Sequence, residues 1–173
     1  SPASVDYLIS EFETVLTMLY TITGNMVSEK AMCASIQTYN EHNAAMREFD
    51  QVANEHLDII TPKVRHIVHK SAFFFEKSEH TAIVKRITAS LNALPDCSFT
   101  GKKVILTGIT AEPDALLHIL EENHIAVTGD NLAQESRQYS ADTPLSGGGA
   151  LKRLALQWNA RKACSLIHEL GKP

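Results

Sequence analysis

The stretch 103–139 limits what this chain can fold into more than any other part of the sequence. Two short apolar runs, Val104–Leu106 and Ile125–Val127, are each followed by a glycine, and a segment with helical periodicity separates them. A strand, a helix and a strand within about 30 residues form a βαβ unit, whose right-handed crossover makes the two strands parallel. We therefore predict a parallel pair of strands at 103–108 and 124–128.

The segment between the two strands predicts an amphipathic helix that ends at Asn123. Its apolar side chains are expected on one face and its acidic side chains mostly on the other. The apolar set is Ala115, Leu116, Ile119 and Leu120, and the acidic set is Glu112, Asp114, Glu121 and Glu122.

The polar residues that follow the second strand form the candidate site. Ligands of open α/β sheets bind beyond the carboxyl ends of the strands, and the polar run 130–138 begins at such an end. The side chains expected to bind substrate are Asp130, Gln134, Glu135, Ser136 and Arg137. Arg137 can hold a carboxylate or phosphate through two hydrogen bonds. Alternatively, Arg137 pairs with Asp130 and pins the loop to the sheet; the residue types do not separate these possibilities. No catalytic residue is assigned.

The residues before the first strand show helical periodicity and no strand pattern. Four amphipathic helices are predicted, and Thr61-Pro62 marks the start of the third, because a capping residue precedes proline at the first helical position. The predicted organisation is a helical subdomain at 1–95, a linker at 96–102 and a partial Rossmann-like α/β domain at 103–173. In the last part, the glycine-rich stretch 140–149 is expected to be a loop and Ala150–Trp158 a helix.

Composition excludes several classes of protein. The 173 residues carry a net charge of −4 and no basic run, which argues against a nucleic-acid surface. No apolar run approaches the length of a membrane span. Three cysteines, Cys33, Cys97 and Cys164, are far apart and odd in number. A disulfide framework is therefore not expected, and the cytoplasm is the predicted compartment.

Histidines and cysteines do not predict a metal site within this chain. His66 and His69 stand one helical turn apart, but no acidic or cysteine partner lies at ligand spacing, so a solvated helix face is favoured. Cys97 and Cys164 each lack a C-x-x-C companion. An iron–sulfur cluster needs about four ligands, so the three cysteines of this chain are not expected to hold one.

Several motifs resemble the 2-hydroxyacyl-CoA dehydratase family, which also includes the ATP-dependent benzoyl-CoA reductase subunits. Members of the family show an apolar strand, a helix and a second strand. The first strand ends in a motif that is Thr107-Gly108 in this chain. The second strand runs into a segment that is Gly129–Leu132 here, and Ser136-Arg137 follows it. Upstream, Tyr39-Asn40 matches a Tyr-Asn of the family, and Cys164–Leu166 matches a Cys-Ser-Leu. The resemblance covers nearly all 173 residues.

One segment of the sequence indicates a particular subunit within this family. The segment Ala133–Gln138 is most similar to the alpha subunit of (R)-2-hydroxyglutaryl-CoA dehydratase. Asn131 stands where many members have a second aspartate, which leaves the role of that position open.

The resemblance implies a lyase that removes water from an (R)-2-hydroxyacyl-CoA to give the enoyl-CoA, as in anaerobic amino-acid fermentation. The implied enzyme is a heterodimer of two dehydratase subunits, each with a [4Fe-4S] cluster held by three cysteines. A separate ATP-dependent iron–sulfur activator supplies one electron, and the substrate passes through a ketyl radical. The family's cluster ligands are expected outside this chain, and Cys164 matches a different cysteine. The isolated chain is therefore expected to be inactive.

Two readings from other classes stay open at this stage. The chain can belong to a benzoyl-CoA reductase-type subunit, or it can be a non-catalytic helical and α/β module that serves subunit packing. A two-stranded parallel sheet is poorly stable by itself, so the sequence is expected to be an excerpt of a larger multidomain subunit. No nucleic acid and no membrane are expected among its partners.

Overall fold

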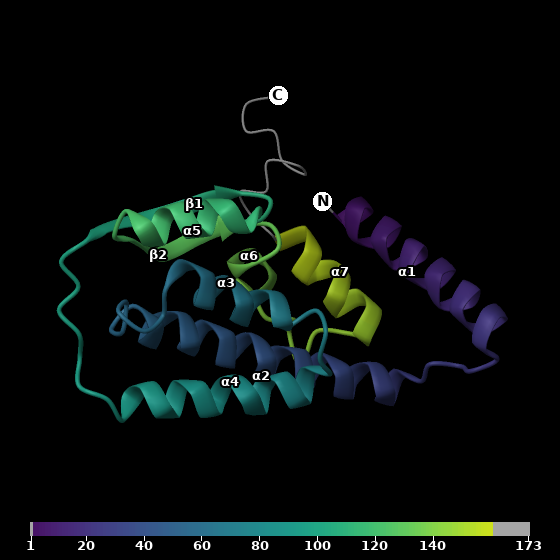
Figure 1. The fold of residues 1–173 in the computed structure, drawn as a ribbon. Helices are drawn as coiled ribbons and strands as arrows, with labels where there is room; N and C mark the ends of the chain where they lie inside the picture. The colour runs from purple at the N-terminus through teal and green to yellow at the C-terminus, as the bar shows by residue number, and fades with distance from the viewer. Residues whose placement is uncertain (1, 161–173) are drawn as a thin grey trace. The chain divides into compact units, whose positions relative to one another are not determined.

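A computed structural model describes residues 2–160 of the chain. It shows a mixed helical and α/β fold with a two-stranded parallel sheet, as the sequence predicts (Figure 1). The chain divides into two compact units, one of residues 1–40 with 141–173 and one of residues 41–140. We call these the terminal unit and the central unit. The predicted division into 1–95, 96–102 and 103–173 stays a prediction.

The terminal unit contains α1 (Pro2–Thr23), the first half of α2 (Glu29–Ala53) and α7 (Ala150–Ala160). Gly24 ends α1 with a φ of +70°, a conformation that glycine adopts without the steric cost of a side chain. Phe12 and Trp158 meet edge to face, with ring centroids 6.2 Å apart. The predicted final helix is confirmed.

The core of the central unit is helical. The second half of α2 packs with α3 (Pro62–Ser71) and α4 (Lys77–Asn92), and α6 (Ser136–Tyr139) closes the cluster. Thr61 caps α3 as predicted, since its hydroxyl accepts a hydrogen bond from the Val64 amide at 3.3 Å. The central residues of this core are fully buried: Met46, Phe49 and Val84.

Strands β1 (Lys102–Gly108) and β2 (Ile125–Leu132) pair in parallel, which confirms the predicted βαβ unit. A register shift lies between Val104 and Ile105, and the ladder then continues to the Gly108–Leu132 pair. The second strand therefore extends four residues beyond its predicted end at Thr128, so Asp130 lies inside a strand and not in a loop.

Helix α5 (Asp114–Glu122) connects the strands, but the apolar face expected from the sequence is not the face that it buries. Leu117 is its buried residue, whereas Leu116 and Ile119 are exposed. The reason lies in tertiary contacts: Leu117 packs on Ala111 and Leu132, and two acidic residues of α5 bond α3. Lys63 donates to Asp114 through its ammonium and to Glu121 through its backbone amide. Burial of one leucine between two such contacts fixes the rotation of a short helix.

Within residues 2–160, none of the helices combines the length and the hydropathy needed to cross a membrane. The Cys164–Leu166 motif lies outside the described residues.

Candidate functional site

Asp130 is the centre of a buried polar cluster at the carboxyl end of β2. Its side chain is fully buried, and Oδ2 lies 3.0 Å from Arg65 Nη2. Its other oxygen accepts hydrogen bonds from the amides of Leu132 and Ser136, at 3.1 and 3.0 Å. The Ser136 hydroxyl donates in turn to the Asp130 carbonyl at 2.8 Å. These bonds fold the chain sharply back after β2.

Hydrogen bonding keeps Asp130 ionised despite its burial. Desolvation alone would raise the pKa of this carboxyl, but the hydrogen bonds from Ser136, Leu132 and Arg65 outweigh it and lower the pKa. Asp130 is therefore a carboxylate at neutral pH, and Arg65 is its counter-charge.

Arg65 joins this carboxylate to a second one. Its side chain is 4% exposed, and Nη1 lies 2.9 Å from Asp50 Oδ1. The same Asp50 oxygen lies 2.9 Å from Nε2 of the fully buried His69. Nε of Arg65 and Nδ1 of His69 are buried without a hydrogen-bond partner in the described part of the chain. Buried polar groups left partly unsatisfied are costly, and a functional role is one physical reason for a protein to keep them.

A series of neighbouring polar side chains extends from the buried cluster to the surface. Glu135, with a side chain only 4% exposed, lies 2.8 Å from Nδ1 of His66. Nε2 of His66 lies 3.8 Å from Glu112 Oε1, which accepts a hydrogen bond from Lys70 at 2.5 Å. That hydrogen bond lowers the pKa of Glu112.

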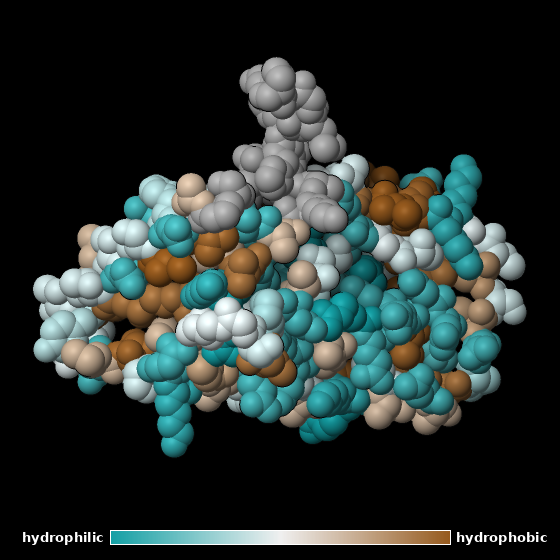
Figure 2. Space-filling view, turned by 180° about the vertical axis from the view of Figure 1, so that it is seen from behind, coloured by the Kyte–Doolittle hydropathy of each residue, from teal (hydrophilic) through white to brown (hydrophobic). Residues whose placement is uncertain are grey.

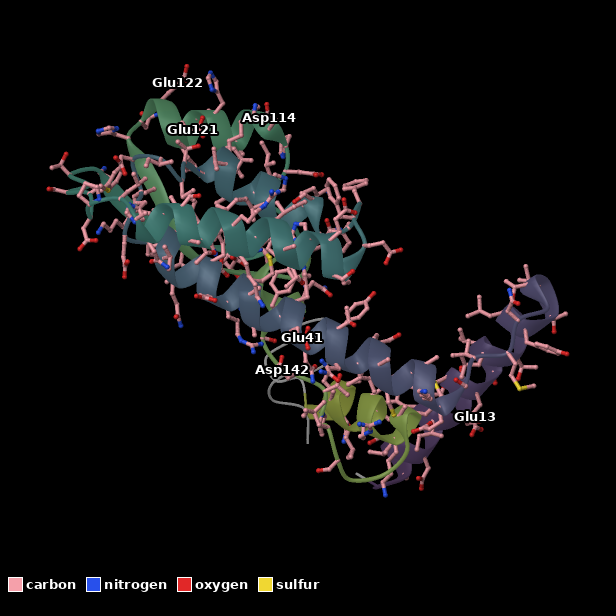
Figure 3. The ribbon with its side chains drawn as sticks, turned by 90° about the horizontal axis from the view of Figure 1, so that it is seen from below. Glu13, Glu41, Asp114, Glu121, Glu122 and Asp142 are labelled. Atoms are coloured by element: carbon pink, nitrogen blue, oxygen red, sulfur yellow. The ribbon has the colours of Figure 1, made fainter. Side chains whose placement is uncertain are left out.

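His66 borders an open depression of about 430 Å³, together with Glu112, Pro113 and Asp114. Figure 3 shows Asp114 on α5, with Glu121 and Glu122 farther along the same helix. The depression lies beside the loop that follows β1, at the carboxyl edge of the sheet, where the sequence places the site.

A different cavity, of about 300 Å³, lies toward the amino ends of the strands. Phe99, Ile125 and Pro62 contribute apolar surface to it, and Glu121 and His124 contribute polar groups. His66, which pairs with Glu135 of the predicted segment, lines the depression at the carboxyl edge and does not line this cavity. We therefore place the candidate site at the carboxyl edge.

The structure separates the five predicted site residues into two groups. Asp130, Glu135 and Ser136 point into the cluster and hold it together. Gln134 is exposed, and half-buried Arg137 donates from Nε to the side chain of Asn131 at 2.6 Å. The alternative prediction, that Arg137 pairs with Asp130, is therefore wrong. Arg65 forms the ion pair with Asp130, and Arg137 lies near the surface.

Sequence reasoning missed Arg65, Asp50 and the two histidines of α3. The predicted solvated face at His66 and His69 is wrong, because His69 is fully buried and His66 is only 12% exposed. One signal was present: Arg65, His66 and His69 lie within two turns of a single helix. Their acidic partners come from α2 and from the residues around the end of β2, so spacing along the chain could not find them.

Two groups of residues bring possible metal ligands together. The ligand atoms of His69, Asp130 and Glu135 lie within 4.8 Å of one another, and so do those of a second group, Glu55, His56 and Asp96. In the first group, however, the guanidinium of Arg65 already lies on Asp130, and His66 lies on Glu135. We assign the positive charge of this cluster to Arg65.

The described cysteines do not fit an iron–sulfur cluster. Cys33 accepts a hydrogen bond from Arg153 Nη2 at 2.7 Å in the terminal unit, whereas Cys97 follows α4 in the central unit. Each is the only cysteine described in its unit, and a cluster needs several thiolates at one place.

Comparison with known proteins gives one family over nearly the whole chain. The family model described as "2-hydroxyglutaryl-CoA dehydratase, D-component" matches residues 1–172. Lactoyl-CoA dehydratase subunit beta of Anaerotignum propionicum is 41% identical over 170 residues, which cover 98% of this chain and 46% of that protein. The (R)-phenyllactyl-CoA dehydratase beta subunit of Clostridium sporogenes is 38% identical over 170 residues, 98% of this chain and 45% of that subunit.

A third relative, (R)-2-hydroxyglutaryl-CoA dehydratase subunit beta of Acidaminococcus fermentans, is 32% identical over 167 residues, 96% of this chain and 44% of that subunit. The chain thus spans less than half the length of these relatives. All three are named as beta subunits, so they do not support the expected likeness to an alpha subunit. The match over residues 1–172 confirms the resemblance at the level of the family, and this chain belongs to the 2-hydroxyglutaryl-CoA dehydratase D-component family.

Proposed function

We propose that the chain is part of a 2-hydroxyacyl-CoA dehydratase subunit, which eliminates water from an (R)-2-hydroxyacyl-CoA to give the enoyl-CoA. The family match over residues 1–172 carries this proposal, and the 41% identity to a lactoyl-CoA dehydratase subunit supports it. The relatives are named for lactoyl, phenyllactyl and hydroxyglutaryl thioesters. The acyl group is therefore the variable part of the substrate and the thioester its constant part.

The proposed partners are a second dehydratase subunit and an ATP-dependent iron–sulfur activator that supplies one electron. The substrate then reacts as a ketyl radical, a [4Fe-4S] cluster serves the complete subunit with ligands outside this chain, and the cytoplasm is the compartment. The cluster supplies one-electron chemistry when bound. The described residues contribute binding and proton positions at the carboxyl edge of the sheet.

We propose that the segment Asp130–Arg137 borders the acyl-CoA site. Asp130, Glu135 and Ser136 hold the segment in place through the buried bonds to Arg65, to His66 and within the turn. Gln134 and Arg137 reach the surface beside it. The planar guanidinium of Arg137 suits a carboxylate or phosphate better than an ammonium does.

The proposal is tested with the polypeptide that carries this chain, reconstituted anaerobically with its partner subunit and activator. Lactoyl-CoA, phenyllactyl-CoA and 2-hydroxyglutaryl-CoA are supplied separately, and the enoyl-CoA is measured by mass spectrometry. We expect at least one enoyl-CoA, formed only when ATP is present. A folded complex that converts none of the three, or that instead reduces benzoyl-CoA, contradicts the proposal.

Arg137→Lys tests the binding role of this residue in the same complex. A ligand contact predicts weaker acyl-CoA binding with an unchanged midpoint of thermal unfolding, because the new ammonium keeps the charge but loses the planar pair of donors. Arg86→Lys, an exposed change on α4, is the matched control. Lower thermal stability with normal acyl-CoA binding would assign Arg137 a structural role through Asn131.

A further inference from the structure

The pair formed by His66 and Glu135 has the geometry of a proton-transfer site. The Glu135 carboxylate lies 2.8 Å from Nδ1 of the imidazole, and both side chains are largely withdrawn from solvent. A carboxylate can only accept a hydrogen bond, so it favours the tautomer that carries the proton on Nδ1. The other ring nitrogen, Nε2, then has a free lone pair in the neutral imidazole.

Nε2 of His66 faces Glu112, and both residues line the open depression. Its nearest acidic neighbour, Glu112 Oε1, lies 3.8 Å away, longer than a hydrogen bond, and that oxygen is held by Lys70. The depression of about 430 Å³ is large enough for the reacting end of a thioester. A base oriented by a buried carboxylate and placed beside a solvent-open depression suits general acid–base catalysis.

The groups around Glu135 fix this arrangement. Glu135 follows β2 closely, and its amide donates to the Leu132 carbonyl at 3.2 Å. Next along the chain, Ser136 is tied to Asp130, and Asp130 is tied to Arg65 on the same helix as His66. The buried ion pair therefore holds the carboxylate and the imidazole of the pair in register across two elements.

We propose that His66 transfers the proton in the dehydration reaction, with Glu135 as its positioning residue. This inference rests on the proposed function. In this step, the C–O bond at the α-carbon breaks and the hydroxyl group leaves as hydroxide. The β C–H bond also breaks, and its proton passes to Nε2 of His66. The imidazolium then gives that proton to the hydroxide, which leaves as water. The substrate gains one electron from the iron–sulfur donor before this step and returns it afterwards. The net reaction is therefore not a redox change, and the products are enoyl-CoA and water.

The experiment uses the complete reconstituted complex with the variant His66→Gln. We expect the dehydration rate to fall by about 10²–10⁴-fold, the usual contribution of a positioned acid–base group, with acyl-CoA binding and thermal unfolding close to wild type. His118→Gln is the matched control, since His118 also lies beside a carboxylate, Glu122, at 3.2 Å, but is exposed on α5. That variant is expected to keep the wild-type rate.

Two further measurements separate proton transfer from a structural role. Free imidazole is expected to restore part of the rate of His66→Ala, and Glu135→Gln is expected to change the pH–rate profile while the product stays the same. A His66→Gln complex as active as wild type overturns this inference alone, as does a rate loss that only follows loss of folding and is not rescued by imidazole. A wild-type complex without dehydratase activity overturns the proposed function and this inference with it.

Discussion

The candidate site of the central unit and helix α1 of the terminal unit place polar and apolar side chains in opposite ways. In the central unit, residues 41–140, charged side chains are buried in contact with one another: Asp130 is fully buried and Arg65 almost so. In the described part of the terminal unit, the second half of α1 instead exposes large apolar side chains, and Figure 2 shows hydrophobic residues gathered over this helix. The most exposed of these are Met18 at 62%, Ile22 at 80% and, just beyond the helix, Met26 at 81%.

Sequence explains why the surface of α1 is so apolar. The segment Thr14–Val27 contains no charged residue. The hydroxyls of its helical threonines donate to their own helix at carbonyls four residues earlier, at 2.8 to 3.0 Å, and this leaves the methyl groups outward. Both units bury charge, since Arg153 of the terminal unit is 6% exposed, but at the candidate site several charged side chains are buried against one another, whereas α1 leaves apolar side chains in solvent.

Loss of Arg65 should give the largest effect on the central unit. Arg65→Met leaves the buried Asp130 and its neighbour Asp50 without their shared cation, and removal of one partner of a buried ion pair costs about 3–5 kcal/mol. Urea unfolding of wild type and variant at pH 7 measures the change. Arg86→Met, at an exposed position on α4, should change the unfolding free energy by less than about 0.5 kcal/mol. Equal effects of the two variants would contradict a buried ion pair.

Truncation of the apolar core beside this cluster should cost nearly as much. Phe49 is fully buried on α2, and Phe→Ala in a core costs about 3–5 kcal/mol through lost burial and the cavity left behind. Phe74→Ala, at a side chain that is 76% exposed, is the control and should be nearly neutral. The midpoint of urea unfolding compares them. A neutral Phe49→Ala would mean that the core of the central unit is not packed as described.

Mild acid should weaken the central unit through its buried histidines. Burial first, and then the charges of Lys77 and His80, lower the pKa of His42 from 6.5 to about 4. Its Nε2 lies 2.9 Å from Nδ1 of His80, whose pKa burial also lowers. Between pH 6.5 and 4 the unfolded chain thus binds more protons than the native chain, so stability falls as pH falls through this window.

The size of the acid effect is on the order of 3 kcal/mol for His42, from a difference of about 2.5 between its pKa values in the unfolded and native chains. Urea unfolding at pH 7 and about pH 4.5 tests it, and His42→Gln should flatten the dependence. Every histidine that the structure describes lies in the central unit, so the described part of the terminal unit should show no corresponding loss above about pH 5. Stability that rises on this acidification would refute the neutral buried histidines.

Local signals in the sequence predicted local structure, and contacts between distant segments decided the rest. The Thr61-Pro62 cap and the two apolar runs each act within a few residues, and the structure has them as predicted. The rotation of α5 depended on Lys63, which lies in another helix. The candidate edge of the sheet was predictable from strand order, but the partner of Asp130 was not, because Arg65 is 65 residues away in the chain.

The smallest effects are expected on α1, where a matched pair of substitutions lies in one helix. Val5 is 8% exposed and Ile22 is 80% exposed. Val5→Ala removes buried methyl groups and should cost about 1 kcal/mol or more, whereas Ile22→Ala should change the unfolding free energy by less than about 0.5 kcal/mol. Urea unfolding of both variants gives the difference directly. If Ile22→Ala costs as much as Val5→Ala, the apolar face of α1 is covered in solution. The contrast between this apolar face and the buried charges of the central unit would then not be one of solvent exposure.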